Sequence, residues 1–134
     1  MSGFSNHLAQ LFINYALRGQ SVTQPPGRYL ALFTADPTDA NVTANEVSGG
    51  WYARQAITFQ APVTSGSNET TTVNASQITF SAVTTSAVTV THWGIYDAAT
   101  SGNLLASGAF TASKTLNVDD IFVVNAEALT VELV

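Results

Sequence analysis

Two hydrophobic periodicities run along this chain, and together they predict one helix followed by a series of strands. Between residues 3 and 18, apolar side chains recur at helical spacing. These side chains are Phe4, Leu8, Leu11, Phe12 and Tyr15. Ser2 or Ser5 can cap the start of the helix, and Gly19 is placed to end it. Ile13 and Leu17 widen the apolar face of this helix. A face of this width indicates burial against the chain's own β domain or against a neighbouring subunit.

The most strand-like run of the chain is Val88–Asp97. The two valines at its start point to one face of a strand, whereas Trp93 and Ile95 point to the other face. The apolar phase therefore flips inside the run. This flip favours either a central strand covered on both faces or a bulge near His92–Gly94.

The remaining β-type runs are short and separated by turn signals. They are 28–34, 51–59, 70–73, 77–80, 104–110, 121–124 and 128–134, with a weak strand or linker at 114–118. The run 28–34 is apolar on both faces, which is typical of an interior strand. The loop 35–50, about sixteen residues long, exceeds most loops in compact domains, and such loops are usually functional or mobile.

Roughly eight short strands with a turn about every ten residues predict a mainly β fold, a β-sandwich or jelly roll, with an open barrel as the alternative. The length of 134 residues fits a single domain over 1–134, with a helix at 3–18 and a β-sandwich over 20–134. We expect the structural core to include Leu30, Leu32, Arg54, Phe59, Trp93 and Ile95. Among aromatic neighbours, the guanidinium of Arg54 is expected to stack on a ring or to pair with Glu46 or Asp97.

Charged residues make up only 10% of the chain, against about 25% in an average soluble domain. A surface rich in neutral hydroxyl and amide groups is easy to desolvate, which favours a protein packed against neighbours, although a Thr-rich outer face is an equal alternative. The net charge of −5, with four basic residues, predicts no nucleic-acid binding. No apolar run reaches the ~20 residues of a membrane-spanning helix, and the N-terminus shows no secretory signal pattern.

Motifs of catalysis are missing from the sequence. The chain has no Cys, no nucleophile elbow and no phosphate-binding glycine loop. The carboxylates Asp36 and Asp39 share one loop, and the pair Asp119–Asp120 precedes a strand, but neither pair has the spacing of a metal site. We therefore expect no enzymatic activity, no cofactor and no bound metal, with these aspartates serving turn chemistry.

Several segments of the sequence resemble small virion proteins of tailed bacteriophages. They are MSGFSNHLAQLF at the start, RYLALFTADPTDA, EVSGGWYARQAITF from Glu46 to Phe59, THWGIYDAATSGNLLASGAF from Thr91 to Phe110, and ALTVELV at the end. The resemblance covers most of the chain and departs mainly near Asn41 and over 61–74. Members of this group are often labelled tail-fibre proteins, and related small β proteins serve as cement on phage heads.

The resemblance implies a virion structural protein, assembled in the host cytoplasm, with no catalytic residues to transfer. Because the chain shows neither long repeats nor a trimeric stalk, head decoration ranks first and a tail or tail-fibre component second. A carbohydrate-binding module is a further alternative, with Trp51, Tyr52 or Trp93 as stacking platforms. The expected partners are further copies of the chain, as a homotrimer, and the major capsid protein or, alternatively, tail proteins. Candidate contact residues are Phe4, Leu8, Leu11, Phe12, Tyr15, Asp36, Asp39 and Glu46.

Overall fold

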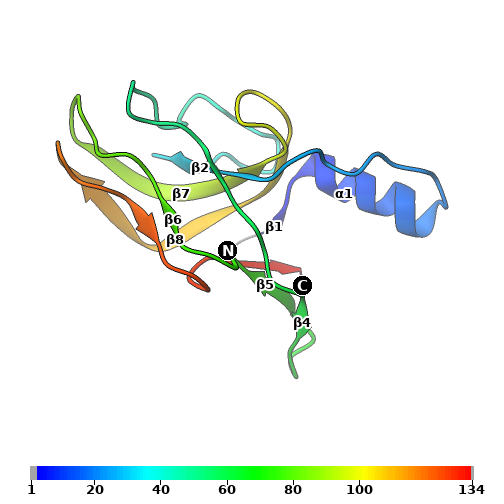
Figure 1. Ribbon diagram of the computed structural model, residues 1–134. Helices are drawn as coiled ribbons and strands as arrows, with labels where there is room; N and C mark the ends of the chain where they lie inside the picture. The colour runs from blue at the N-terminus through cyan, green and yellow to red at the C-terminus, as the bar shows by residue number, and fades with distance from the viewer. Residues whose placement is uncertain (1–2, 134) are drawn as a thin grey trace.

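In the computed structural model, which describes residues 3–133, the chain forms antiparallel sheets around one main core, with a helical arm at one end (Figure 1). The largest sheet has five strands in the order β1-β8-β7-β2-β3. These strands are β1 (Gly3–Phe4), β8 (Leu104–Leu116), β7 (Val88–Tyr96), β2 (Tyr29–Phe33) and β3 (Gln55–Ala56). Two smaller sheets complete the fold, and the whole is consistent with the predicted β-sandwich.

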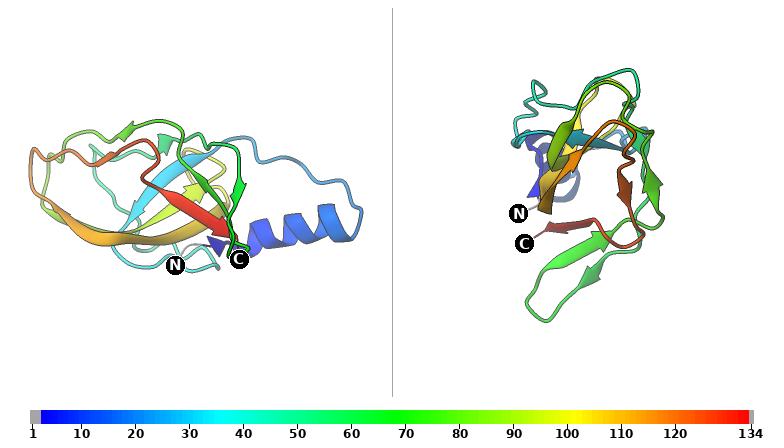
Figure 2. Two further views of the ribbon diagram at one scale, coloured as in Figure 1. Left: turned by 90° about the horizontal axis from the view of Figure 1, so that it is seen from below. Right: turned by 90° about the vertical axis from the view of Figure 1, so that its left-hand side faces the viewer.

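The smaller sheets have the strand orders β10-β5-β4 and β6-β9. Their strands are β10 (Thr130–Leu133), β5 (Thr70–Val73), β4 (Val63–Thr64), β6 (Ile78–Thr79) and β9 (Val123–Val124). The view in Figure 2 from the side opposite the arm shows the β4–β5 hairpin and the C-terminal strand below the large sheet. The main core lies between the large sheet and the smaller ones, and it includes Val131 of β10 together with Phe80 and Phe122, which adjoin β6 and β9.

The central strand β7 combines both features that its sequence left open. Val90 and Trp93 belong to the same core although they stand an odd number of positions apart, so the strand changes phase between them. The pairing with β8 is irregular there, because the partner of Val90 is Lys114 whereas the partner of His92 is Ala109. Beyond the irregularity, both faces of β7 are covered, since Tyr96 packs in a second cluster on the opposite face.

The second cluster joins Ala31, Phe33 and Leu104 to Tyr96. The loop 35–50 is tied to the edge of this region rather than extended away from it. Glu46 forms a β-bridge with Phe33, and the Tyr96 hydroxyl donates to Asn41 Oδ1 at 2.6 Å. The loop therefore closes over its own sheet.

The N-terminal segment departs from the predicted helix over 3–18. Gly3 and Phe4 pair with β8 as a short strand, and α1 (Asn6–Phe12) begins only after Ser5, whose hydroxyl accepts from the Leu8 amide. The helix then continues as η1 (Ile13–Leu17), a π-helical turn, and Gly19 follows it at a positive φ of 65°. Neither helical segment contains a fully buried residue, and although Leu8 packs against the main core, the apolar face as a whole is not buried against the chain's own β domain.

Other predicted strand boundaries also differ from those in the structure. Of the predicted strand 51–59, only Gln55–Ala56 is a strand, because Trp51 and Tyr52 are placed by side-chain packing and a hydroxyl bond rather than by a sheet ladder. The weak strand or linker predicted at 114–118 is in fact the end of β8, down to Leu116. Between the predicted strands 51–59 and 70–73, where no strand was expected, Val63–Thr64 forms the short strand β4.

Candidate functional site

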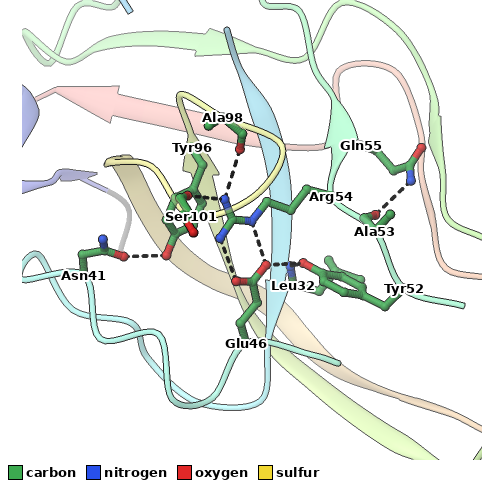
Figure 3. Close-up of polar contacts among 10 residues, drawn as sticks. All are labelled: Leu32, Asn41, Glu46, Tyr52, Ala53, Arg54, Gln55, Tyr96, Ala98 and Ser101. Carbon is green, nitrogen blue, oxygen red and sulfur yellow. Dashed lines mark hydrogen bonds and ion pairs between the residues drawn. The ribbon is translucent and has the colours of Figure 1, made fainter. Parts of the chain in front are cut away.

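An ionic cluster around Arg54 lies at one edge of the large sheet (Figure 3). The guanidinium grips the Glu46 carboxylate with two parallel contacts, Nε to Oε2 and the second terminal nitrogen to Oε1, each 2.8 Å long. It also stacks on Tyr96, with its central carbon 3.7 Å from the ring centroid. The Arg54 side chain is only 5% exposed, and that of Glu46 is 16% exposed. The ring and the carboxylate expected from the sequence are thus both present, with Glu46 rather than Asp97 as the partner.

The other donors of Arg54 reach the turn after β7. Its first terminal nitrogen donates to the carbonyl oxygens of Ala98 and Ser101, at 3.0 and 2.7 Å. On the opposite side, the Tyr52 hydroxyl donates to Glu46 Oε2 at 2.7 Å and accepts from the Leu32 amide at 3.1 Å. The cluster therefore ties the 35–50 loop, the 97–103 turn and the edge of β2 into one unit.

The electrostatics of the cluster favour the protonated tyrosines and the cationic arginine. Burial raises the pKa of Tyr52 far above its ordinary value, and the neighbouring Glu46 adds to this effect. Burial likewise raises the pKa of Tyr96 to about 12, although Arg54 opposes the shift. Burial alone would lower the pKa of Arg54, but the hydrogen bonds and charge of Glu46 outweigh it, and the net shift is upward.

This arrangement suits a structural clamp better than a reaction centre. Four of the five N–H donors of Arg54 are already used within the chain, and the Glu46 carboxylate is held from two sides. An open hollow of about 380 Å³ lies beside the clamp, lined by neutral residues such as Ser48 and Thr100 together with the cluster itself. The clamp fixes the shape of this surface.

A second polar hollow, of about 420 Å³, is lined by ionisable and hydroxyl side chains outside the Arg54 cluster. Asp36, Asp39, His92 and Ser107 line it. His92 Nδ1 lies 2.8 Å from the hydroxyl of Thr91, and Asp36 accepts from the Thr38 amide as expected for turn chemistry. Within residues 3–133 no group of three or more His, Cys, Asp or Glu side chains is arranged to hold a metal ion.

The two tryptophans proposed as sugar platforms are buried. Trp51 is 7% exposed and Trp93 is 3% exposed, and both belong to the main core. Tyr52 stacks on Phe80 with ring centroids 6.1 Å apart. Trp51 and Trp93 therefore cannot serve as sugar platforms, and of Tyr52 one ring face is taken by Phe80.

The remaining predicted residues are divided between core and surface. Leu30, Leu32 and Ile95 are buried with Trp93, while Phe59 is half-buried against the same core. Among the candidate contact residues, exposure increases along the helix from its start to its end. Phe4, Leu8 and Leu11 are half-buried, Phe12 and Tyr15 are exposed, and so are Asp36 and Asp39.

Sequence reasoning missed one buried polar centre, Asn74. Its amide nitrogen donates to the carbonyls of Ser76 and Asn125, and its amide oxygen accepts from the Leu129 amide, each at 2.9 Å. This side chain joins the end of β5 to the segment before β10. Asn74 stands between two turn signals in the sequence, and no local pattern distinguishes it from the other asparagines of the chain.

Comparison with known families adds the decisive observation. Residues 3–132 match the family described as podophage GP4 fiber I protein gp80. The chain belongs to this family. The resemblance to phage virion proteins is thereby confirmed, and the chain is a bacteriophage structural protein and a virion component. A search of curated proteins finds no match, and within the described residues no helix is both long and apolar enough to cross a membrane.

Proposed function

We propose that this protein is a non-enzymatic fibre component of a podophage virion. The observation that carries the proposal is the family match, which spans residues 3–132 and names a fibre protein. The geometry supports a structural role, because the Arg54 cluster uses its charges to hold loops together. The low charged fraction of 10% also suits a protein that packs against neighbours.

The proposed partners are further copies of this chain and tail proteins of the same virion. The residues described here contain only one short helical arm and no long helix that could form a stalk. A fibre made from such units therefore depends on contacts between folded domains, and a symmetric oligomer, with a trimer as the expectation, provides them. Head decoration, which the sequence analysis ranked first, receives no support from the family match and becomes the competing outcome of the test.

The test is a phage with this gene deleted, grown with and without a complementing copy. A fibre component predicts tails that lack fibre density in averaged electron micrographs, while the heads stay filled and keep their heat resistance. Complementation should restore the density. Tails with all their fibres, together with heads that lose DNA on mild heating, would instead assign the protein to the head shell.

A further inference from the structure

The helical arm, residues 6–27, projects from the β-sandwich (Figures 1 and 2). It consists of α1, η1 and the segment 18–27 that returns to β2. The attachment to the body is at its base, where the Asn6 amide donates to the Asp39 carbonyl and Leu8 packs against the main core. The far end of the arm packs on no strand of the body.

The tip of the arm, Phe12–Arg18, exposes four large apolar side chains, beside a polar face on which Arg18 donates to Asn14. Phe12 is 49% exposed, Ile13 47%, Tyr15 67% and Leu17 76%. The π-helical turn lies in this same stretch, and π-turns inside helices are frequent at functional sites. Large exposed apolar side chains on a helix mark an interaction surface. Within the described residues this stretch is covered only in part, because Phe12 and Tyr15 line an open hollow against the return segment at Val22 and Pro25.

The exposed apolar area of the tip is large enough to form part of a protein–protein interface. Since a fully buried aromatic side chain contributes about 150–250 Å², the exposed parts of Phe12 and Tyr15 together offer roughly 200–300 Å². Ile13 and Leu17 add to this, which brings the tip into the range of a few hundred Å² where apolar patches mark interaction sites. A standard interface buries about 800 Å² per partner, so the tip supplies a central part of such a contact and the surface around it the rest.

The distribution of charge indicates which surface receives the tip. The arm carries Arg18 and no carboxylate, a net charge of +1, whereas the rest of the chain has 3 basic and 9 acidic residues, a net charge of −6. A contact between two tips would bring two Arg18 cations together. A contact between the tip and the body of another copy brings opposite charges together, and Asp36 and Asp39 are exposed there without an ion pair to the described residues.

We propose that the arm of each copy seats its tip on the body of a second copy, in a head-to-tail contact that closes into a ring. A head-to-tail interface uses two different surfaces of each subunit, and a ring satisfies both surfaces on every copy. This inference rests on the proposed self-association of the fibre component and names the surface that drives it. The charge at the tip orients the contact, and the apolar side chains supply its affinity.

The experiment measures the mass of the purified full chain by light scattering at several protein concentrations. The wild type should be an oligomer. The double variant Tyr15→Ser with Leu17→Ser should raise the dissociation constant by about 30-fold or more, because central apolar anchors dominate interfaces. The matched control is Val63→Ser on β4, which removes a side chain that is 65% exposed and should leave the mass unchanged. All three proteins should give the same circular dichroism spectrum, since these side chains are exposed and their loss leaves the fold intact.

A second measurement distinguishes the geometry. The chain has no native cysteine, so Leu17→Cys places a single thiol at the tip. In a head-to-tail ring the tips stay apart, and mild oxidation should give no disulfide-linked dimer. Efficient dimer formation would overturn the head-to-tail contact.

A wild type that stays monomeric at high micromolar concentration, or an oligomer that survives the tip variant, would also overturn it. Neither result would alter the outcome of the gene deletion. An oligomer that depends on the tip, in a phage whose fibres persist after deletion, would uphold the arm contact and refute the fibre role.

Discussion

Removal of either partner of the Arg54–Glu46 pair is the sharpest test of the clamp. We consider Arg54→Met, which keeps the length of the side chain but removes its charge and all its donors. We also consider Glu46→Gln, which keeps the shape of the acid and removes its charge. Each change leaves the other charge in a site that is 5–16% exposed.

The expected loss of unfolding free energy follows from the burial of the ion pair rather than from the number of its contacts. Loss of one partner of a buried ion pair costs about 3–5 kcal/mol, because the remaining charge is desolvated without compensation. For Arg54→Met the hydrogen bonds to Ala98 and Ser101 and the contact with the Tyr96 ring are lost as well. We therefore expect Arg54→Met near the upper end of this range and Glu46→Gln near the lower end. Both are a large share of the ~5–15 kcal/mol that holds a typical domain together.

The assay is equilibrium unfolding in guanidinium chloride, followed by the fluorescence of Trp51 and Trp93, which are both buried. The double variant should cost clearly less than the sum of the two single variants, since each single change already breaks the pair. Lys114→Met, at an exposed cation on β8, is the control and should stay within about 0.5 kcal/mol of the wild type. Losses below about 1 kcal/mol for both single variants would refute the reasoning, because that is the size of a solvated surface pair.

Three further changes test other parts of the account. Trp93→Ala removes a core side chain that is 3% exposed and should cost about 3–5 kcal/mol by the same assay; a loss under about 1 kcal/mol would contradict its placement in the core. Asn74→Ala removes the partner of the buried Leu129 amide and one donor from each of two part-buried carbonyls, and should cost at least about 2 kcal/mol, whereas a neutral result would mean that water reaches these groups. Because the folded state raises the pKa values of Tyr52 and Tyr96, stability should be fully present below the ordinary pKa of 10.0 and decline as the pH rises through about 12. Phenolate absorbance of these two residues should appear together with loss of ellipticity. Tyr96→Phe should weaken the pH dependence of stability. Ionisation of both residues in the folded protein at pH 10 would contradict the raised pKa values.

The sequence was sufficient for features that depend on alternation and on local turn chemistry. The run 28–34, apolar on both faces, predicted the interior strand β2, and the phase change inside 88–97 indicated either a covered central strand or a bulge near His92–Gly94, of which the structure contains both. The arginine among aromatic residues indicated that Arg54 stacks on a ring or pairs with Glu46 or Asp97, and the structure shows the stacking together with the Glu46 pair. In each case the informative residues are close together in the chain.

Features that depend on distant contacts were not predictable. The helical period begins at Phe4, but Phe4 pairs with Ala106 of β8, about a hundred residues away, and so becomes part of a strand. The strand expected at 51–59 is mostly absent because Tyr52 and Arg54 are held by Glu46 and by the 97–103 turn, which no local pattern reveals. The exposure of the arm was not predictable for a related reason, since an apolar helix has the same pattern whether its own domain or another chain covers it.

The position of the protein on the virion tests the central claim most directly. Purified virions can be incubated with gold-labelled antibodies raised against the folded domain, and the gold particles can be located on head and tail by electron microscopy. The deletion phage provides the background. A fibre component places gold on the fibres of the tail and none above background on the head. Gold distributed over the head shell, with unlabelled tails, would contradict this placement.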